Sequence, residues 1–159
     1  MQQPEIVEVA DRTLIATRMT MSLSKNRTRE LWQEFRPRAK EILNRVGTDF
    51  FSIQHYPDNF SMADFRPHTI FEKLAGIEVE NHALIPDGME AYTLAGGKYA
   101  VFTHHGPATT AAKTFQYIYG VWIPNSAYEL DRRDQFEVLG SDYRPDDPNA
   151  EEEVWIPIK

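Results

Sequence analysis

The spacing of apolar residues constrains the fold of this chain most. It alternates between the strand period of two and the helical spacing of three and four, and the same succession of strands and helix occurs twice. Short alternating stretches predict strands, and two longer segments with spacings of three and four predict helices. The predicted order is strand, helix, strand, strand, and then the same again. The predicted strands are residues 5–9, 13–19, 50–56, 68–79, 89–94, 98–105, 135–139 and 154–158, and the predicted helices run from Ser24 or Asn26 to 46 and from 108 to 122.

Two such modules side by side predict an α+β fold, with a mainly antiparallel sheet covered by two main helices. The length of 159 residues suits one domain, with one module at about 5–80 and a second at about 89–159. Residues 95–97, Ala-Gly-Gly, read as a hairpin connection. The junction between two similar modules is a natural place for a ligand groove.

The two predicted helices differ in character. The first has one apolar face, and Pro37 is expected to kink or divide it. Its predicted face comprises Leu31, Phe35, Ala39, Ile42, Leu43 and Val46. The second, which contains TFQYIYGVWIP, is apolar almost all the way round, so its second face needs a cover. A subunit interface in a homodimer, a packed loop and an aromatic pocket are the alternatives.

Composition and motifs exclude several kinds of site. The chain has no cysteine, which excludes disulfides and thiolate metal sites, and its net charge of -7 disfavours direct nucleic-acid binding. The N-terminus lacks a signal pattern and no apolar stretch approaches the ~20 residues that cross a bilayer, so we expect a cytoplasmic protein without membrane contact. No nucleotide motif is visible and no cofactor is expected. His104 and His105 are adjacent and point to opposite faces of a strand, so no metal site is expected.

Glu137 stands in the apolar stretch DQFEVLG, residues 134–140. In a strand it shares a face with Gln135 and Leu139, whereas Phe136 and Val138 share the other. Glu137 is therefore either a solvated charge or a carboxylate placed in a pocket. A carboxylate among aromatic rings would form a receptor for a lipophilic cation, because the rings attract cations and exclude water.

Several stretches together resemble the DNA gyrase inhibitor-like (GyrI-like) effector-binding domain, which is also the ligand-binding half of bacterial multidrug-responsive regulators of the AraC and MerR types. The stretches are WQEFRPRAKEILNRVGTDFFSIQHY, EKLAGIEV, IPDGMEAYTLAGGKYAVFTHHGP, YIYGVWIPNSAYELDRRDQFEVLG and EEEVWIPIK. The resemblance implies two pseudo-symmetric modules with a ligand groove between them, and it implies that Glu137 lies in that groove.

The same resemblance suggests residues for the groove walls. Trp155, Tyr99 and Trp122 are the first candidates, and the wider set of ligand-binding candidates adds Tyr119, Phe102 and His104. The regulators carry a DNA-binding domain fused to this one. No helix-turn-helix pattern precedes Glu5, so we expect a stand-alone protein.

We therefore predict a small-molecule binding protein that captures an amphipathic, cationic compound in an aromatic groove with a central carboxylate. Two alternatives remain open. One is a hydrolase in which Glu137 acts as general base with a tyrosine hydroxyl or His104 as partner. The other is a protein-interaction module that inhibits gyrase through its acidic surface.

Overall fold

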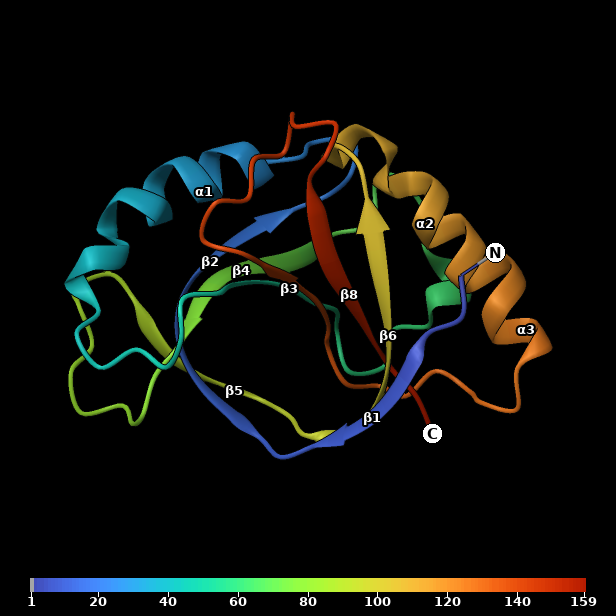
Figure 1. Cartoon of the computed structure of the whole chain (residues 1–159), viewed down its shortest axis with the longest axis horizontal. Coiled ribbons are helices and arrows are strands. Elements are labelled where there is room, and N and C mark those ends of the chain that lie inside the picture. Colours follow the sequence, from blue (N-terminus) through green and yellow to red (C-terminus); the bar gives the residue numbers. More distant parts are fainter. Residues whose placement is uncertain (1) are drawn as a thin grey trace.

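The computed structural model describes residues 2–159, which form one eight-stranded sheet and two main helices (Figure 1). The strands are β1 (Glu5–Val9), β2 (Arg12–Met21), β3 (Phe50–His55), β4 (Phe71–Glu78), β5 (Glu90–Leu94), β6 (Gly97–His105), β7 (Gln135–Leu139) and β8 (Glu151–Pro157). Their order in the sheet is β1-β6-β8-β7-β3-β4-β2-β5, and every pairing is antiparallel. The helices are α1 (Thr28–Phe35), α2 (Ala111–Tyr117) and the short α3 (Ile123–Asn125). The predicted α+β fold is confirmed.

The sheet consists of two halves that repeat the same arrangement. One half has the order β5-β2-β4-β3 and the other β1-β6-β8-β7, and they meet where β3 pairs with β7. Each half receives its outer strand from the other end of the chain, because β1 pairs with β6 and β5 pairs with β2. The modules predicted at 5–80 and 89–159 therefore exchange edge strands.

The Ala-Gly-Gly connection at 95–97 is consequently not a hairpin, and that prediction was wrong. It joins β5 at one edge of the sheet to β6 in the other half. Here it crosses the link between β1 and β2: the Gly96 amide donates to Asp11 Oδ1 at 2.6 Å. A Cβ on Gly96 would lie 2.5 Å from the backbone of Val9 and Ala10, so only glycine allows the two connections to touch.

The sheet curls around one of its faces, here called the inner face. Residues from all eight strands pack there into a single cluster without help from a helix. The cluster comprises Val7, Val9, Leu14, Ala16, Phe51, Ile53, Leu74, Tyr92, Leu94, Tyr99, Val101, Phe136, Val138 and Trp155. Such a cluster requires the strong right-handed twist that antiparallel sheets adopt.

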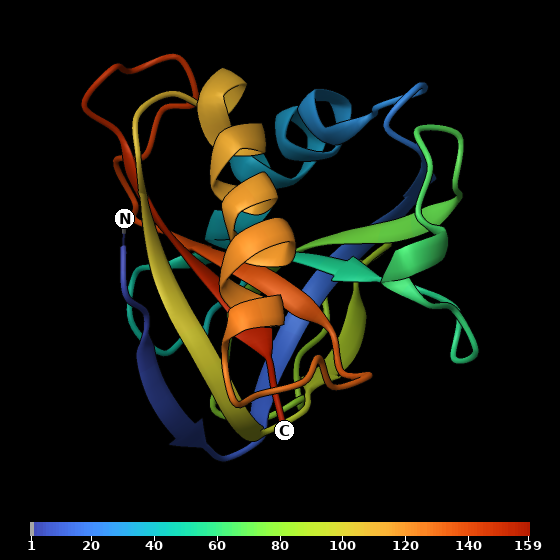
Figure 2. The same ribbon diagram turned by 90° about the vertical axis from the view of Figure 1, so that its right-hand side faces the viewer.

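The opposite face, here called the helical face, carries both main helices. Figures 1 and 2 show α1 over one half of the sheet and α2 over the other. Each helix covers its own apolar cluster: α1 contributes Leu31 and Phe35 to one, and the segment after α2 contributes Ile118 and Trp122 to the other. The strip of sheet between the two clusters is where β3 and β7 meet.

Pro37 divides the first helix as predicted, and a 3-10 turn at Arg36–Glu41 follows α1. Ile42 is already extended, so the helical spacing ends there. Leu31, Phe35, Ala39 and Ile42 are buried as expected. Leu43 and Val46 were wrongly predicted on the same face, and their side chains are 76% and 45% exposed.

The second helix changes pitch along its length. Its α-helical part ends at Tyr117, and Ile118–Trp122 forms a π-helical turn before α3. Ile118 and Trp122 face the sheet, whereas the rings of Phe115 and Tyr119 stack on each other 6.5 Å apart at the side of the helix. The N-terminal segment covers part of the other side, where Tyr117 donates to the Gln2 carbonyl at 2.8 Å. The homodimer remains a prediction, which gel filtration with light scattering would test.

The division of the first helix gives a stability prediction. Phe35→Ala should lower the free energy of unfolding by about 3–5 kcal/mol, because it empties a fully buried site. Leu43→Ala should change it by less than about 0.5 kcal/mol, because that side chain is in solvent. Urea unfolding followed by circular dichroism measures both, and equal effects would contradict the observed end of the helix.

Candidate functional site

The candidate site lies on the helical face at the junction of the two halves. Ser52 of β3 pairs directly with Glu137 of β7, and Glu137 pairs in turn with Val154 of β8. The same row continues to Phe102 on β6 and to Ala75 on β4. Glu137 is thus the central side chain between the cluster beneath α1 and the cluster beneath α2.

A small hollow adjoins this carboxylate, and we call it the Glu137 cleft. It leaves no space for even a water molecule and is lined by Gln54, Phe115, Gln135, Phe136, Glu137 and Val154. Drug-sized ligands occupy pockets of roughly 300–1,000 Å³. The cleft is therefore closed, and a ligand of that size can enter only if its walls separate.

A chain of hydrogen bonds holds the walls together. Tyr119 donates its hydroxyl proton to Gln135 Oε1. Gln135 Nε2 donates to Gln54 Oε1 at 2.7 Å, and the Tyr56 hydroxyl donates to the same oxygen at 2.8 Å. This chain links the turn after α2 to the centre of the sheet and to the start of the loop that follows β3.

Aromatic side chains lie near the cleft. Phe115 lines it, and the ring of Tyr119 stacks on that of Phe115. Tyr56, which donates to Gln54, begins an aromatic cluster that includes Phe60, with the two rings stacked 5.2 Å apart. Phe65 and Phe71 complete that cluster.

The charge at the centre is unusual. Glu137 is partly buried and takes part in no ion pair found within residues 2–159. The pKa of Glu137 is raised to about 8, first by burial and then by the neighbouring Glu152 carboxyl. Lys73 and His104 act in the opposite direction on this pKa. An empty site consequently favours the protonated, neutral form of Glu137.

Two predicted wall residues lie on the other side of the sheet. Tyr99 and Trp155 belong to the inner-face cluster, where both contact Phe136. Trp155 pairs with Phe136, one residue away from Glu137, so its side chain points away from the Glu137 cleft. The structure therefore does not group Tyr99 and Trp155 with Glu137.

Three further candidates lie on the helical face but beside the cleft. Phe102 is fully buried beneath α2, and Trp122 packs edge-on against it with ring centroids 5.3 Å apart. Trp122 also lines a larger open groove at the β1 edge, whose walls carry no carboxylate. His104 is buried, with Nδ1 2.6 Å from Thr114 Oγ1 and Nε2 3.2 Å from the Pro107 carbonyl oxygen. Of the predicted wall residues, Tyr119 alone joins the hydrogen-bond chain at Glu137's side.

Sequence reasoning missed several residues at the site: Gln54, Tyr56, Phe115, Gln135 and Glu152. Strand alternation already places Gln54 with Ser52, and Gln135 with Glu137, on shared faces. That signal identifies neighbours within one strand. It does not show which strands lie side by side, so Glu152 could not be paired with Glu137 from the sequence.

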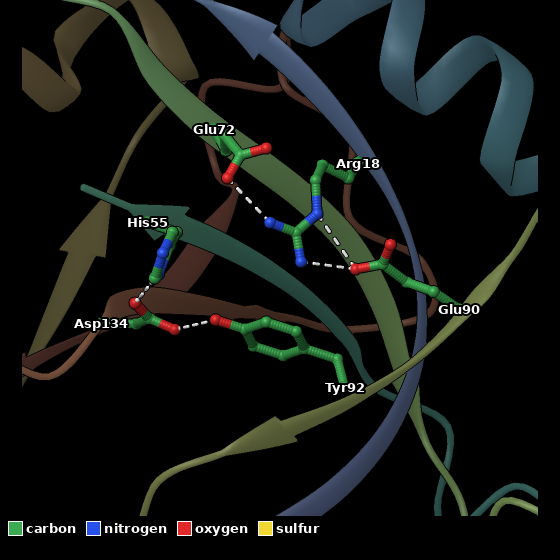
Figure 3. A network of polar contacts seen from close by, with 6 residues as sticks. All are labelled: Arg18, His55, Glu72, Glu90, Tyr92 and Asp134. Carbon is green, nitrogen blue, oxygen red and sulfur yellow. Dashed lines mark hydrogen bonds and ion pairs between the residues drawn. The ribbon is translucent and has the colours of Figure 1, made fainter. Parts of the chain in front are cut away.

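A separate polar network occupies the inner face (Figure 3). Arg18 contacts Glu72 at 2.7 Å and Glu90 at 2.5 Å. Asp134 accepts from Tyr92 and lies 2.8 Å from His55 Nδ1. All its acids have partners, so this network ties strands together and presents no free charge of the kind found at Glu137.

Comparisons with known proteins agree with this architecture. The model of the GyrI-like small molecule binding domain matches residues 2–159, and the chain belongs to this family. The transcriptional regulator BrlR of Pseudomonas aeruginosa is 33% identical over 131 residues, which cover 81% of this chain and 45% of BrlR. The chain thus spans less than half the length of that regulator.

Solved structures share the fold at low identity. SAV2435 bound to tetraphenylphosphonium has a TM-score of 0.70 at 18% identity and covers 99% of this chain and 94% of that one. The EcmrR–DNA complex gives a TM-score of 0.75 at 13% identity and covers 99% of this chain and 57% of EcmrR. Within residues 2–159, no helix has the length and apolar character needed to cross a membrane.

The raised pKa of Glu137 predicts how stability depends on pH. The unfolded side chain loses its proton near its ordinary pKa of 4.5, whereas the folded one keeps it up to about 8. The stability that the neutral form provides is therefore complete below 4.5 and is lost as pH rises towards 8. Glu137→Gln should gain on the order of 1–3 kcal/mol relative to wild type between about pH 5 and about pH 9.

Urea unfolding at each pH provides the measurement. Glu153→Gln is the matched control, because Glu153 is exposed and lies on the inner face opposite Val138. Glu153 accepts the indole N–H of Trp155, and Gln keeps an oxygen for that bond, so this difference from wild type should be smaller than that of Glu137→Gln. If the Glu137→Gln difference did not change with pH, Glu137 would not be the group that retains its proton.

Proposed function

We propose that this protein binds lipophilic organic cations in the Glu137 cleft, with Glu137 as counter-charge and aromatic side chains as walls. The observation that carries the proposal is a carboxylate that has no ion-pair partner among residues 2–159 and lies between two helix-covered clusters. A charge in such a place costs free energy unless it meets an opposite charge. A bound cation supplies that charge, and the aromatic rings favour it further.

The walls of the cleft fit an amphipathic ligand. Phe115 and Tyr119, and Tyr56 with its aromatic neighbours, offer flat apolar surfaces. Opening the cleft requires Tyr119 to leave Gln135, and the π-helical turn at Ile118–Trp122 contains Tyr119. Such turns are frequent at functional sites. The structural neighbour SAV2435, solved with tetraphenylphosphonium, supports a ligand of this kind.

Two expected partners of Glu137 under the hydrolase alternative, His104 and Tyr119, are directed elsewhere. His104 was one expected partner, but both of its ring nitrogens are occupied by Thr114, Thr110 and the Pro107 carbonyl. The hydroxyl of Tyr119 is directed to Gln135 and not to Glu137. Ligand binding requires only a counter-charge and apolar walls, whereas hydrolysis also requires a positioned catalytic partner, so we favour binding. We also propose that this protein is located in the cytoplasm, because one relative is a transcriptional regulator and one structural neighbour binds DNA.

Isothermal titration calorimetry with ligands of one shape and different charge tests the proposal. Tetraphenylphosphonium should bind to wild type, and tetraphenylborate, which has the same shape and a negative charge, should not. Glu137→Gln should weaken phosphonium binding at least tenfold, about 1.4 kcal/mol, because the counter-charge is gone.

Glu153→Gln, with the same change on the inner face, should bind as wild type does. Circular dichroism confirms that each variant is folded. Equal affinity of wild type and Glu137→Gln for the phosphonium would contradict the assignment of the site. Equal affinity for the phosphonium and the borate would contradict a charge-selective cleft.

A further inference from the structure

A second carboxylate lies beside Glu137 and has no role so far. Glu152 is on β8, two residues before Val154, which pairs with Glu137. Both acids therefore point to the helical face from neighbouring strands, where Glu152 lies opposite Leu139 and diagonal to Glu137. Glu152 is only 5% exposed, and it too takes part in no ion pair found within residues 2–159.

The two halves of the sheet differ in charge at the position that Glu152 occupies. Ala75 of β4 pairs with Ser52 as Val154 of β8 pairs with Glu137. Two residues earlier on each strand stand Lys73 and Glu152, which are therefore equivalent positions with opposite charge. Lys73 Nζ donates to Thr28 Oγ1 of α1 at 3.3 Å and forms no ion pair with Glu137. The negative side of the site is the side beneath α2.

The other groups around the two acids form no ion pair with them among residues 2–159. The two of cationic type, Lys73 and His104, only lower the pKa of Glu137 from a distance, and His104 pairs with Glu152 across β6 and β8. His104 of β6 is held by Thr114 and Pro107. Tyr143, in the loop after β7, and Tyr119 have pKa values raised by burial and remain neutral hydroxyls. Two carboxylates that are neighbours on the same buried face cannot both ionise at low cost when no cation joins them.

We propose that Glu137 and Glu152 share one proton in the empty site, and that a lipophilic monocation binds by replacing it. The proton passes to solvent and both carboxyl groups then face the bound cation. The site has one net negative charge before and after the exchange, so binding adds no net charge to a buried environment. This inference rests on the proposed function and names its ligand class and its coupling to pH.

The exchange predicts a specific pH dependence of tetraphenylphosphonium binding to wild type. Affinity should rise about tenfold per pH unit over a range that ends near the point where the shared proton is lost. Calorimetry at one pH in buffers of different ionisation enthalpy should show close to one proton released per ligand. Without Glu152 the like charge is gone, so in Glu152→Gln the rise should end at least about one pH unit lower.

Glu152→Leu provides a second variant, because a buried acid replaced by an apolar side chain of similar volume generally folds. It should shift the pH range in the same direction, and Glu153→Gln should leave it unchanged. Phosphonium binding with an unshifted pH range in both Glu152 variants, or with no proton release in wild type, would overturn the shared proton while leaving the cation site intact. Absence of phosphonium binding to wild type at every pH would overturn the proposed function and this inference together.

Discussion

The pairing of β3 with β7 is the constraint on which the site depends. It joins the two halves of the sheet at their centre and places Ser52 directly opposite Glu137. A slip of one residue in this pairing would turn Glu137 to the inner face and Phe136 to the helices. The register is therefore fixed by apolar burial on both faces, and the position of the carboxylate follows from it.

On the inner face, arginine side chains of the same chain lie against aromatic rings. The Arg12 guanidinium carbon lies 4.9 Å from the Trp155 ring centroid and 5.3 Å from that of Phe51. Arg133 is 4.5 Å from the ring of Tyr99. Two of the predicted wall residues, Trp155 and Tyr99, therefore contact arginines of the same chain. On the helical face, Glu137 forms no ion pair within the described part of the chain, residues 2–159.

Local patterns in the sequence predicted most of the fold. Period-two stretches identified the strands, and β7 has the predicted bounds of 135–139. Pro37 was correctly read as a break. Leu43 and Val46 were local errors, whereas the hairpin expected at 95–97 failed because the relation between distant strands was not visible in the sequence. Alternation shows that Val154 and Trp155 face opposite sides, but only the β7–β8 register shows which of them joins Glu137.

The closed state of the cleft bears on selectivity under the proposed function. Opening it breaks the hydrogen bonds that join Tyr119, Gln135, Gln54 and Tyr56, and buried polar groups left without partners cost about 1–3 kcal/mol each. A small hydrated ion brings a charge but no apolar surface to offset this cost. A neutral aromatic compound brings the surface but leaves the carboxyl pair unmatched. A lipophilic cation supplies both, so the closed cleft and the buried acids select for the same class of ligand.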